Sequence, residues 1–325
     1  MTATRSAPTL NTTTTATTRK RPYRARLSCT SLYADFFPAC LAFLDMASMA
    51  NCALVCKDWH RGLQDPFVWE QFYGLSWRHG QLFPKQLAAL EPQETGSVAL
   101  QLRRACMQRL RVPLSISTRA QTWIRPNGSV FVLNDSLRRS MDSGSTESVR
   151  SRDALSPLAV VHALTGRRVC YFEVSMTGCG SIGLASVSNP NERATYGFTS
   201  SHHVGWAPVS YGFHGDNGNL YFNDGSAPIG GVELHYGPVW GDQTPQVCRK
   251  TPAAPVVVGC GWDMDLGQLF FTLNGRWLGI APVAIDAKRE FAAAVTLHRL
   301  GDYAELNLGR SAFVFDLEAF VVGAA

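Results

Sequence analysis

The sequence lacks the features that mark a membrane protein, a secreted disulfide-linked protein or a zinc-binding protein. No apolar run is long enough to cross a bilayer, and no signal-peptide core is present. Nine cysteines are scattered from Cys29 to Cys260 without a CxxC pair, so neither zinc-ligand nor disulfide spacing is recognisable. We therefore expect a reduced, intracellular protein, cytoplasmic, nuclear or both, with buried thiols and no membrane partner.

Charged residues are also few, at 17% of the chain, and acidic residues are absent from positions 1–27. The cations of this segment are Arg5, Arg19, Lys20, Arg21, Arg24 and Arg26. Without them the chain holds 24 basic and 25 acidic residues, so the net charge of +5 comes from this segment and no nucleic-acid partner is expected. Residues 1–27 are rich in Thr and predict a disordered basic tail, either a localisation signal or a solvated leader.

Motifs for catalysis, metal binding or cofactor binding are missing from the sequence. There is no GxSxG elbow and no Walker loop. The neighbouring His202 and His203 would point to opposite faces of an extended chain, which makes them a poor pair of metal ligands. We expect no catalytic residue, no metal and no cofactor. One alternative of another class is a cysteine hydrolase built around Cys179, although the flanking glycines fit a structural turn better and no histidine base is specified.

What the sequence does contain, from Leu32 onward, is apolar residues at helical spacing. Four of them recur at intervals of four residues: Leu32, Phe36, Cys40 and Leu44. Asp65-Pro66 predicts a helix start, because Asp can cap the helix and Pro fits its first position. Three or four short helices in residues 28–80 carry more apolar side chains than so small a bundle can bury, which indicates a partner.

Three stretches of this segment form a compact pattern: Leu41-Ala42-Phe43-Leu44-Asp45, Val55-Cys56-Lys57-Asp58-Trp59 and Asp65-Pro66-Phe67-Val68-Trp69. Together they resemble an F-box, with departures at Tyr33, Asp35 and Met49, where the family usually has Pro, Glu and Leu. The resemblance implies that an apolar face packs on the Skp-type adaptor of a cullin–RING ubiquitin ligase. The residues expected on that face are Leu32, Phe36, Leu44, Val55 and Trp59.

Farther along the chain the pattern changes from helix to strand. Residues 81–112 predict a helical connector, broken at Glu91-Pro92. Beyond it, apolar and polar residues alternate, and Asn127-Gly128 and Asn274-Gly275 predict tight hairpins. The polar residues 138–152 predict a mobile loop. Strands are expected at 170–176, 181–187, 256–263, 268–273, 276–280, 291–297 and 303–308, which together indicate an antiparallel sandwich.

Several stretches follow one another in a diagnostic order: Tyr171-Phe172-Glu173-Val174, Ser210 to Gly218, Val258 to Asp263, and Phe270 to Gly275. They resemble a SPRY domain of the Ran-binding-protein-M type, spanning residues 113–320. SPRY domains bind short peptide segments through loops at one end of the sandwich. In related SOCS-box proteins the pocket uses an Arg-bearing loop, a Tyr and a Trp-Gly turn. By that resemblance the target-binding loops here contain Arg138, Arg139, Tyr196, Leu300 and Gly301, with Leu300 in place of the Trp.

The sequence therefore predicts two modules, a small all-α F-box helical unit at 28–80 and an all-β antiparallel SPRY β-sandwich. The implied function is that of a substrate-recognition subunit of an SCF-type ubiquitin ligase. Its partners would be a Skp-type adaptor with its cullin complex and an unknown target protein, held through a short peptide segment. Ubiquitin transfer would be done by the partner subunits. The alternative is a SPRY interaction scaffold outside any ligase.

Overall fold

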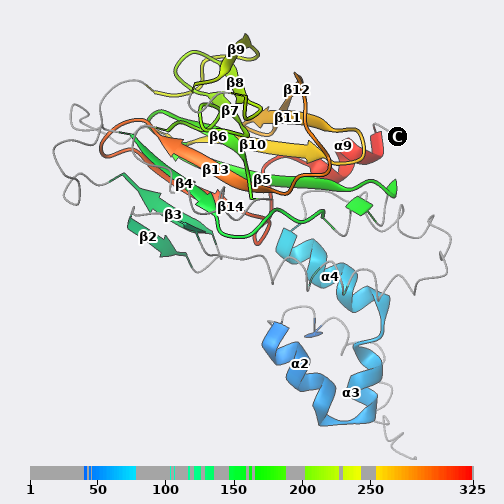
Figure 1. Cartoon of the computed structure of the whole chain (residues 1–325). Coiled ribbons are helices and arrows are strands. Elements are labelled where there is room, and N and C mark those ends of the chain that lie inside the picture. The colour runs from blue at the N-terminus through cyan, green and yellow to red at the C-terminus, as the bar shows by residue number, and fades with distance from the viewer. Residues whose placement is uncertain are drawn as a thin grey trace, which may run out of the picture.

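The computed structural model describes residues 40–41, 44, 46–77, 103, 106, 116–117, 121–125, 129–134, 146–158, 161–162, 165–187, 202–226, 230–242 and 254–323. Short helices and a two-sheet β-sandwich make up this part of the chain (Figure 1). None of its helices combines the length and the apolar character needed to cross a membrane.

The sandwich consists of two seven-stranded sheets in which every neighbouring pair of strands is antiparallel. The first sheet runs β1 (Ile116–Ser117), β4 (Glu147–Ser151), β13 (Phe291–Leu297), β6 (Gly180–Ser186), β7 (Ser210–His214), β8 (Asn219–Asn223) and β9 (Val232–His235). The second sheet runs β12 (Arg276–Ala284), β11 (Gln268–Leu273), β10 (Val256–Asp263), β5 (Val169–Thr177), β14 (Tyr303–Asn307), β3 (Val130–Leu133) and β2 (Gln121–Ile124). The predicted antiparallel β-sandwich is confirmed.

Strand alternation explains the core between the sheets. Ala304 and Leu306 of β14 are buried, whereas the intervening Tyr303 and Glu305 are half-buried. Aromatic rings join the two layers, as where Phe213 of β7 lies 5.3 Å from Phe271 of β11, centroid to centroid. The apolar alternation that predicted these strands is therefore the pattern that builds the core.

The predicted strands at 256–263, 268–273 and 291–297 match β10, β11 and β13. The hairpin between β11 and β12 turns on Asn274 and Gly275, whose φ angles of 48° and 76° are both positive. Two consecutive positive φ values are what a type I′ turn requires, and Asn-Gly adopts them at little cost. Beyond the predicted strand end at 280, β12 continues to Ala284 through irregular register with β11.

The prediction of a mobile loop over 138–152 is wrong for its last residues. Residues 147–151 form β4, paired with β13 on one side and β1 on the other. Polar side chains are tolerated here because they have partners inside the protein. The Arg150 guanidinium donates a hydrogen bond to the Ser186 carbonyl at 3.1 Å, and the Ser148 and Thr296 hydroxyls lie 2.9 Å apart.

The helical unit consists of α2 (Met46–Val55), α3 (Lys57–Gly62) and α4 (Pro66–Trp77), with α4 nearest the sandwich (Figure 1). The C-terminal helix α9 (Leu317–Gly323), which the sequence pattern did not predict, packs against the outer face of the second sheet, where Phe320 lies 5.6 Å from Phe270. One apolar cluster joins the two regions: it includes Met49 of α2, Trp69 of α4, Tyr171 of β5 and Val321 of α9. The helices and the sandwich therefore share a core.

Candidate binding surfaces

The corner between α2 and α3 presents apolar side chains to solvent. Cys56 interrupts the helix with an extended backbone, at φ −160° and ψ 171°, and α3 starts at the next residue. Just before this break, Leu54 is 84% exposed and Val55 is 61% exposed. Burying an aliphatic side chain of this size in a partner contributes about 1.5–3 kcal/mol. The corner is thus an apolar surface available for binding.

The start of α4 adds an aromatic ring to this unit's exposed surface. The Phe67 backbone N–H donates to Asp65 Oδ1 at 3.0 Å, so Asp65 caps the helix and Pro66 occupies its first position, as predicted. Phe67 itself is 44% exposed. Trp69, two residues later, is buried, and its indole N–H donates to the Leu63 carbonyl at 2.7 Å. The cap fixes where α4 begins, and the packing of α4 then places Trp69 in the core and leaves Phe67 in solvent.

The predicted adaptor face is only partly described by the structure. Val55 is exposed, whereas Leu44 and Trp59 are half-buried and pack against the shared core. Leu32 and Phe36 lie outside the described residues. Leu54 and Phe67 were not predicted as contact residues. Their exposure depends on which side of each short helix the sandwich covers, and nothing in the local sequence encodes that.

At the sandwich, the turn between β13 and β14 contains two of the predicted target-binding residues. Asp302 is buried, and its Oδ2 accepts hydrogen bonds from the backbone N–H groups of Cys179 (3.2 Å) and Arg299 (3.0 Å). The side-chain amide of Asn134 donates to the Arg299 carbonyl at 2.7 Å, and its backbone carbonyl accepts from the Gly301 N–H at 2.9 Å. These bonds hold the turn in one shape.

The same turn explains the exposure of Leu300 and the need for glycine after it. Gly301 has a φ of 82°, a conformation that costs an L side chain free energy. Leu300 is 39% exposed at the turn. The other predicted target-binding residues, Arg138, Arg139 and Tyr196, lie outside the described residues. Whether the five meet in one pocket stays a prediction.

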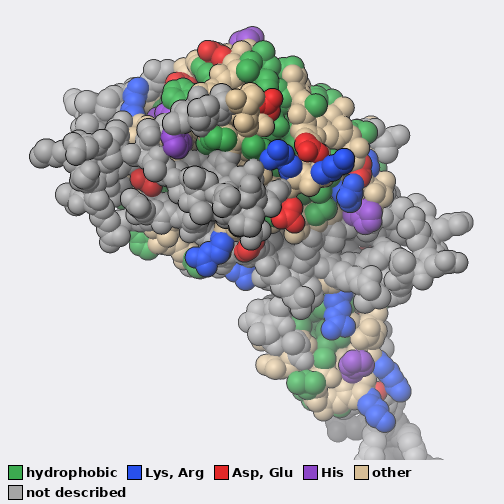
Figure 2. Space-filling view, in the orientation of Figure 1, with side chains coloured by type: hydrophobic (Ala, Val, Ile, Leu, Met, Phe, Trp, Pro, Cys, Tyr) green, Lys and Arg blue, Asp and Glu red, His purple; other side chains and the backbone are tan. Residues whose placement is uncertain are grey.

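On the face drawn in Figure 2, the described charges are of both signs. Figure 2 shows basic and acidic side chains interspersed over the visible, described surface. Several are paired, as Arg168 is with Asp265, whose pKa is lowered by hydrogen bonds from the Arg168 backbone and guanidinium. The described part of this face therefore does not form a field of one sign.

In the structure, His298 lies beside Cys179, a neighbour that the sequence did not specify. Cys179 lies in the turn between β5 and β6, as predicted, and its Sγ is 3.6 Å from Nδ1 of His298. Burial raises the pKa of Cys179 to about 12 and lowers the pKa of His298 to about 2. The pair is therefore a thiol and a neutral imidazole at neutral pH, not the thiolate and imidazolium that a cysteine nucleophile needs.

Comparison with known families agrees with both regions. Residues 169–311 match the SPRY domain model, and residues 40–74 match the F-box-like model. The chain contains an F-box-like segment and a SPRY domain. This architecture is typical of non-catalytic adaptors, in which the F-box supports adaptor binding and the SPRY domain supports protein binding.

The curated relatives align with the SPRY part of the chain. Ran-binding protein 9 of Xenopus tropicalis is 30% identical over 173 residues, 53% of this chain and 27% of that protein. The dual specificity protein kinase splA of Dictyostelium discoideum is 32% identical over 129 residues, 36% of this chain and 4% of that protein. A solved human SPRY domain, 21% identical, covers 60% of this chain and 97% of its own, with a TM-score of 0.36. The chain thus spans about a quarter of Ran-binding protein 9 and far less of the kinase.

Proposed function

We propose that the protein is the substrate-recognition subunit of an SCF-type ubiquitin ligase. In this proposal the F-box, at 28–80, binds a Skp-type adaptor, and the connector at 81–112 leads to the SPRY domain at 113–320, whose loops bind the target. The exposed apolar corner of Leu54 and Val55 is the observation that carries the proposal, because a small helical unit with a filled core leaves such side chains in water only at a cost.

The proposed adaptor contact consists of apolar side chains that are not buried in the protein's own core. Met49 and Trp69 are buried in the protein's own core, while Leu54, Val55 and Phe67 are exposed on the same two helices, α2 and α4. Apolar anchors on short helices suit a partner that offers a groove, since the anchors supply affinity and the surrounding polar residues complete the fit. Leu32 and Phe36 extend this proposed face.

The shared core gives the proposed receptor a defined geometry. Tyr73 of α4 donates a hydrogen bond to Glu318 of α9, and both helices pack into the cluster on the outer face of the second sheet. A target held at the SPRY loops would then lie at a fixed position relative to the adaptor. The receptor contributes proximity in this arrangement: it raises the effective concentration of a target lysine at the conjugating enzyme.

The proposed target site is the loop end that carries Leu300 and Gly301, together with Arg138, Arg139 and Tyr196. The rigid turn between β13 and β14 supports this assignment, because a preordered, partly exposed apolar residue loses little entropy when a peptide packs on it. Leu in place of an aromatic residue makes the apolar contact smaller. We therefore propose a peptide segment that differs from those bound by the SOCS-box relatives.

Co-purification with a Skp-type adaptor tests the proposal. Val55→Asp should weaken capture more than tenfold, because desolvating an unpaired carboxylate costs more than the roughly 1.4 kcal/mol that a tenfold change represents. The matched control is Val239→Asp, since Val239 is 57% exposed and lies on the sandwich. Equal capture by both variants would mean that the adaptor contacts another surface. A wild-type chain that captures no adaptor would contradict the ligase role and favour the scaffold alternative.

A further inference from the structure

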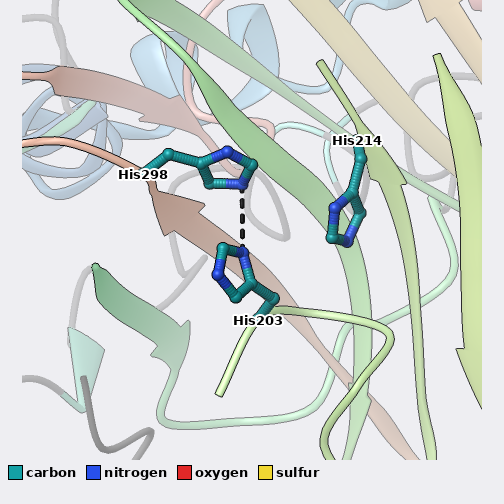
Figure 3. Close-up of side chains that lie close together, drawn as sticks. All are labelled: His203, His214 and His298. Carbon is teal, nitrogen blue, oxygen red and sulfur yellow. Dashed lines mark hydrogen bonds between the residues drawn. The ribbon is translucent and has the colours of Figure 1, made fainter. Parts of the chain in front are cut away.

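Three histidines from separate parts of the chain converge at one place in the sandwich (Figure 3). His203 precedes β7, His214 ends β7, and His298 directly follows β13. One ring nitrogen from each lies within 4.8 Å of the other two. His214 is buried and the other two are half-buried. The cluster includes His203 but not the neighbouring His202, because the side chains of adjacent residues in an extended chain point in opposite directions.

The hydrogen bonds of His214 decide which of its nitrogens could bind a cation. Its Nε2 lies 2.8 Å from the carbonyl oxygen of Val204. A carbonyl only accepts, so Nε2 carries the proton, and Nδ1 of the neutral ring presents a lone pair. Asp216 places a carboxylate oxygen 3.9 Å from that Nδ1, which adds negative charge beside a bound cation. A backbone carbonyl that fixes the tautomer of a histidine is a common support of metal ligands.

The other two histidines already lie at a separation that suits a shared metal ion. Nδ1 of His203 is 3.1 Å from Nε2 of His298. Zinc bonds of 2.0–2.1 Å in tetrahedral geometry place neighbouring ligand nitrogens about 3.3 Å apart. A cation between these two nitrogens needs a lone pair on each, so the proton of His298 would lie on Nδ1, which is 3.6 Å from Cys179 Sγ. Closing the third nitrogen onto the same ion requires a movement of about 1.5 Å.

Aromatic side chains enclose the cluster and limit how its rings can rotate. Trp206 lies 4.4 Å from the His203 ring, and Tyr221 lies 4.3 Å from the His214 ring, centroid to centroid. The Asn217 amide in turn donates to the Tyr221 hydroxyl at 2.8 Å. Ligand rings held by packing lose little entropy on binding, so the movement that closes the site on a cation costs little conformational entropy.

We propose that His203, His214 and His298 form a binding site for a divalent transition metal of the zinc class. Three imidazoles suit zinc, copper, nickel or iron(II), and they leave a fourth position open to water or to an acceptor from a partner. The bound ion would connect the turn before β7 to the turn after β13, two residues from Leu300. The site stands independently of the proposed ligase role.

Calorimetric titration of Zn²⁺ alone into the chelator-treated full chain tests the site, with thiols kept reduced. We expect one equivalent to bind, and His203→Gln and His298→Gln to weaken that binding at least tenfold. His202→Gln is the matched control, since it changes the adjacent imidazole outside the cluster, and it should leave the affinity within twofold. Equal affinities in all three variants, or no binding by the wild type, would overturn the proposal.

Two measurements on the wild-type chain keep the test decisive if a variant fails to fold. The absorption spectrum of bound Co²⁺ should show ligand-field bands without the charge-transfer band of a thiolate ligand, because the free cysteines are not ligands in this proposal. Nitrogen-15 spectra of labelled histidine should show three imidazoles shifting on Zn²⁺ binding, two of them protonated at Nε2 (His203 and His214) and one at Nδ1 (His298). A thiolate band, or shifts on other histidines, would contradict the assignment.

Discussion

Substitution of Tyr73 tests whether the helical unit and the sandwich fold as one body. Its side chain is fully buried in the cluster that contains residues of α4, β5 and α9, and its hydroxyl donates a hydrogen bond to Glu318. Tyr73→Ala removes a large ring from this core. The space cannot be refilled by a local adjustment, because its walls belong to distant parts of the chain.

The expected loss follows from the two parts of the side chain. Aromatic-to-alanine substitutions in cores cost about 3–5 kcal/mol. Tyr73→Phe keeps the ring and removes only the hydroxyl hydrogen bond, for a cost of about 0.5–1.5 kcal/mol. Because the three short helices depend on this contact for part of their core, the larger loss should increase their local opening roughly a hundredfold or more.

Native-state hydrogen exchange, read by mass spectrometry, measures that opening segment by segment. In Tyr73→Ala we expect faster exchange in α2 and α4 and no change in β6 and β13, which lie in the separate core between the sheets. Tyr73→Phe should show an effect of tenfold or less. Phe67→Ala is the control on the same helix, since Phe67 is exposed. Unchanged protection of α2 and α4 in Tyr73→Ala would refute the shared core.

Three further predictions concern the sandwich. Glu173 is buried and accepts hydrogen bonds from the backbone N–H groups of Val314 and Phe315. Glu173→Gln should therefore lower the free energy of unfolding, measured by urea titration, by about 2–3 kcal/mol, and a change under about 0.5 kcal/mol would contradict this. Cys179, with its pKa raised to about 12, should resist iodoacetamide at pH 8 in the native protein while the exposed Cys56 reacts; labelling of native Cys179 would revive the hydrolase alternative. Joint replacement of Arg138 and Arg139 by Ala should weaken target capture at unchanged Tm, and undiminished capture would place the peptide site elsewhere.

The sequence alone could predict most of the sandwich, because its strands carry their own pattern. β10, β11 and β13 were predicted by apolar runs bounded by turn residues, and the Asn274-Gly275 hairpin by its turn chemistry. β4 was missed because Ser148 and Arg150 are polar. Their burial depends on acceptors from β6 and β13, far away in the sequence.

The candidate sites were less predictable, because each depends on tertiary contacts. No local signal brings His203, His214 and His298 together: the pairing of β6 with β7 and β13 places His214 and His298, and the hydrogen bonds of Val204 with Thr296 and His214 place the neighbouring His203. The exposure of Leu54 and the burial of Met49, both on α2, follow from where α4 and the sandwich cover that helix. What the sequence could indicate was that the segment has more apolar residues than it can bury.

The position of α9 affects how the chain folds during its synthesis. α2, α3 and α4 leave the ribosome before the sandwich does, but Leu317 and Val321, which complete their cluster, lie at the other end of the described chain. At translation rates of 5–20 residues per second, α9 follows α4 by roughly 12–48 s. Throughout that interval the nascent helices expose both their outer apolar corner and the face that later packs on the sandwich. Chaperones, or the adaptor proposed above, thus have a long opportunity to bind them before the sandwich is complete.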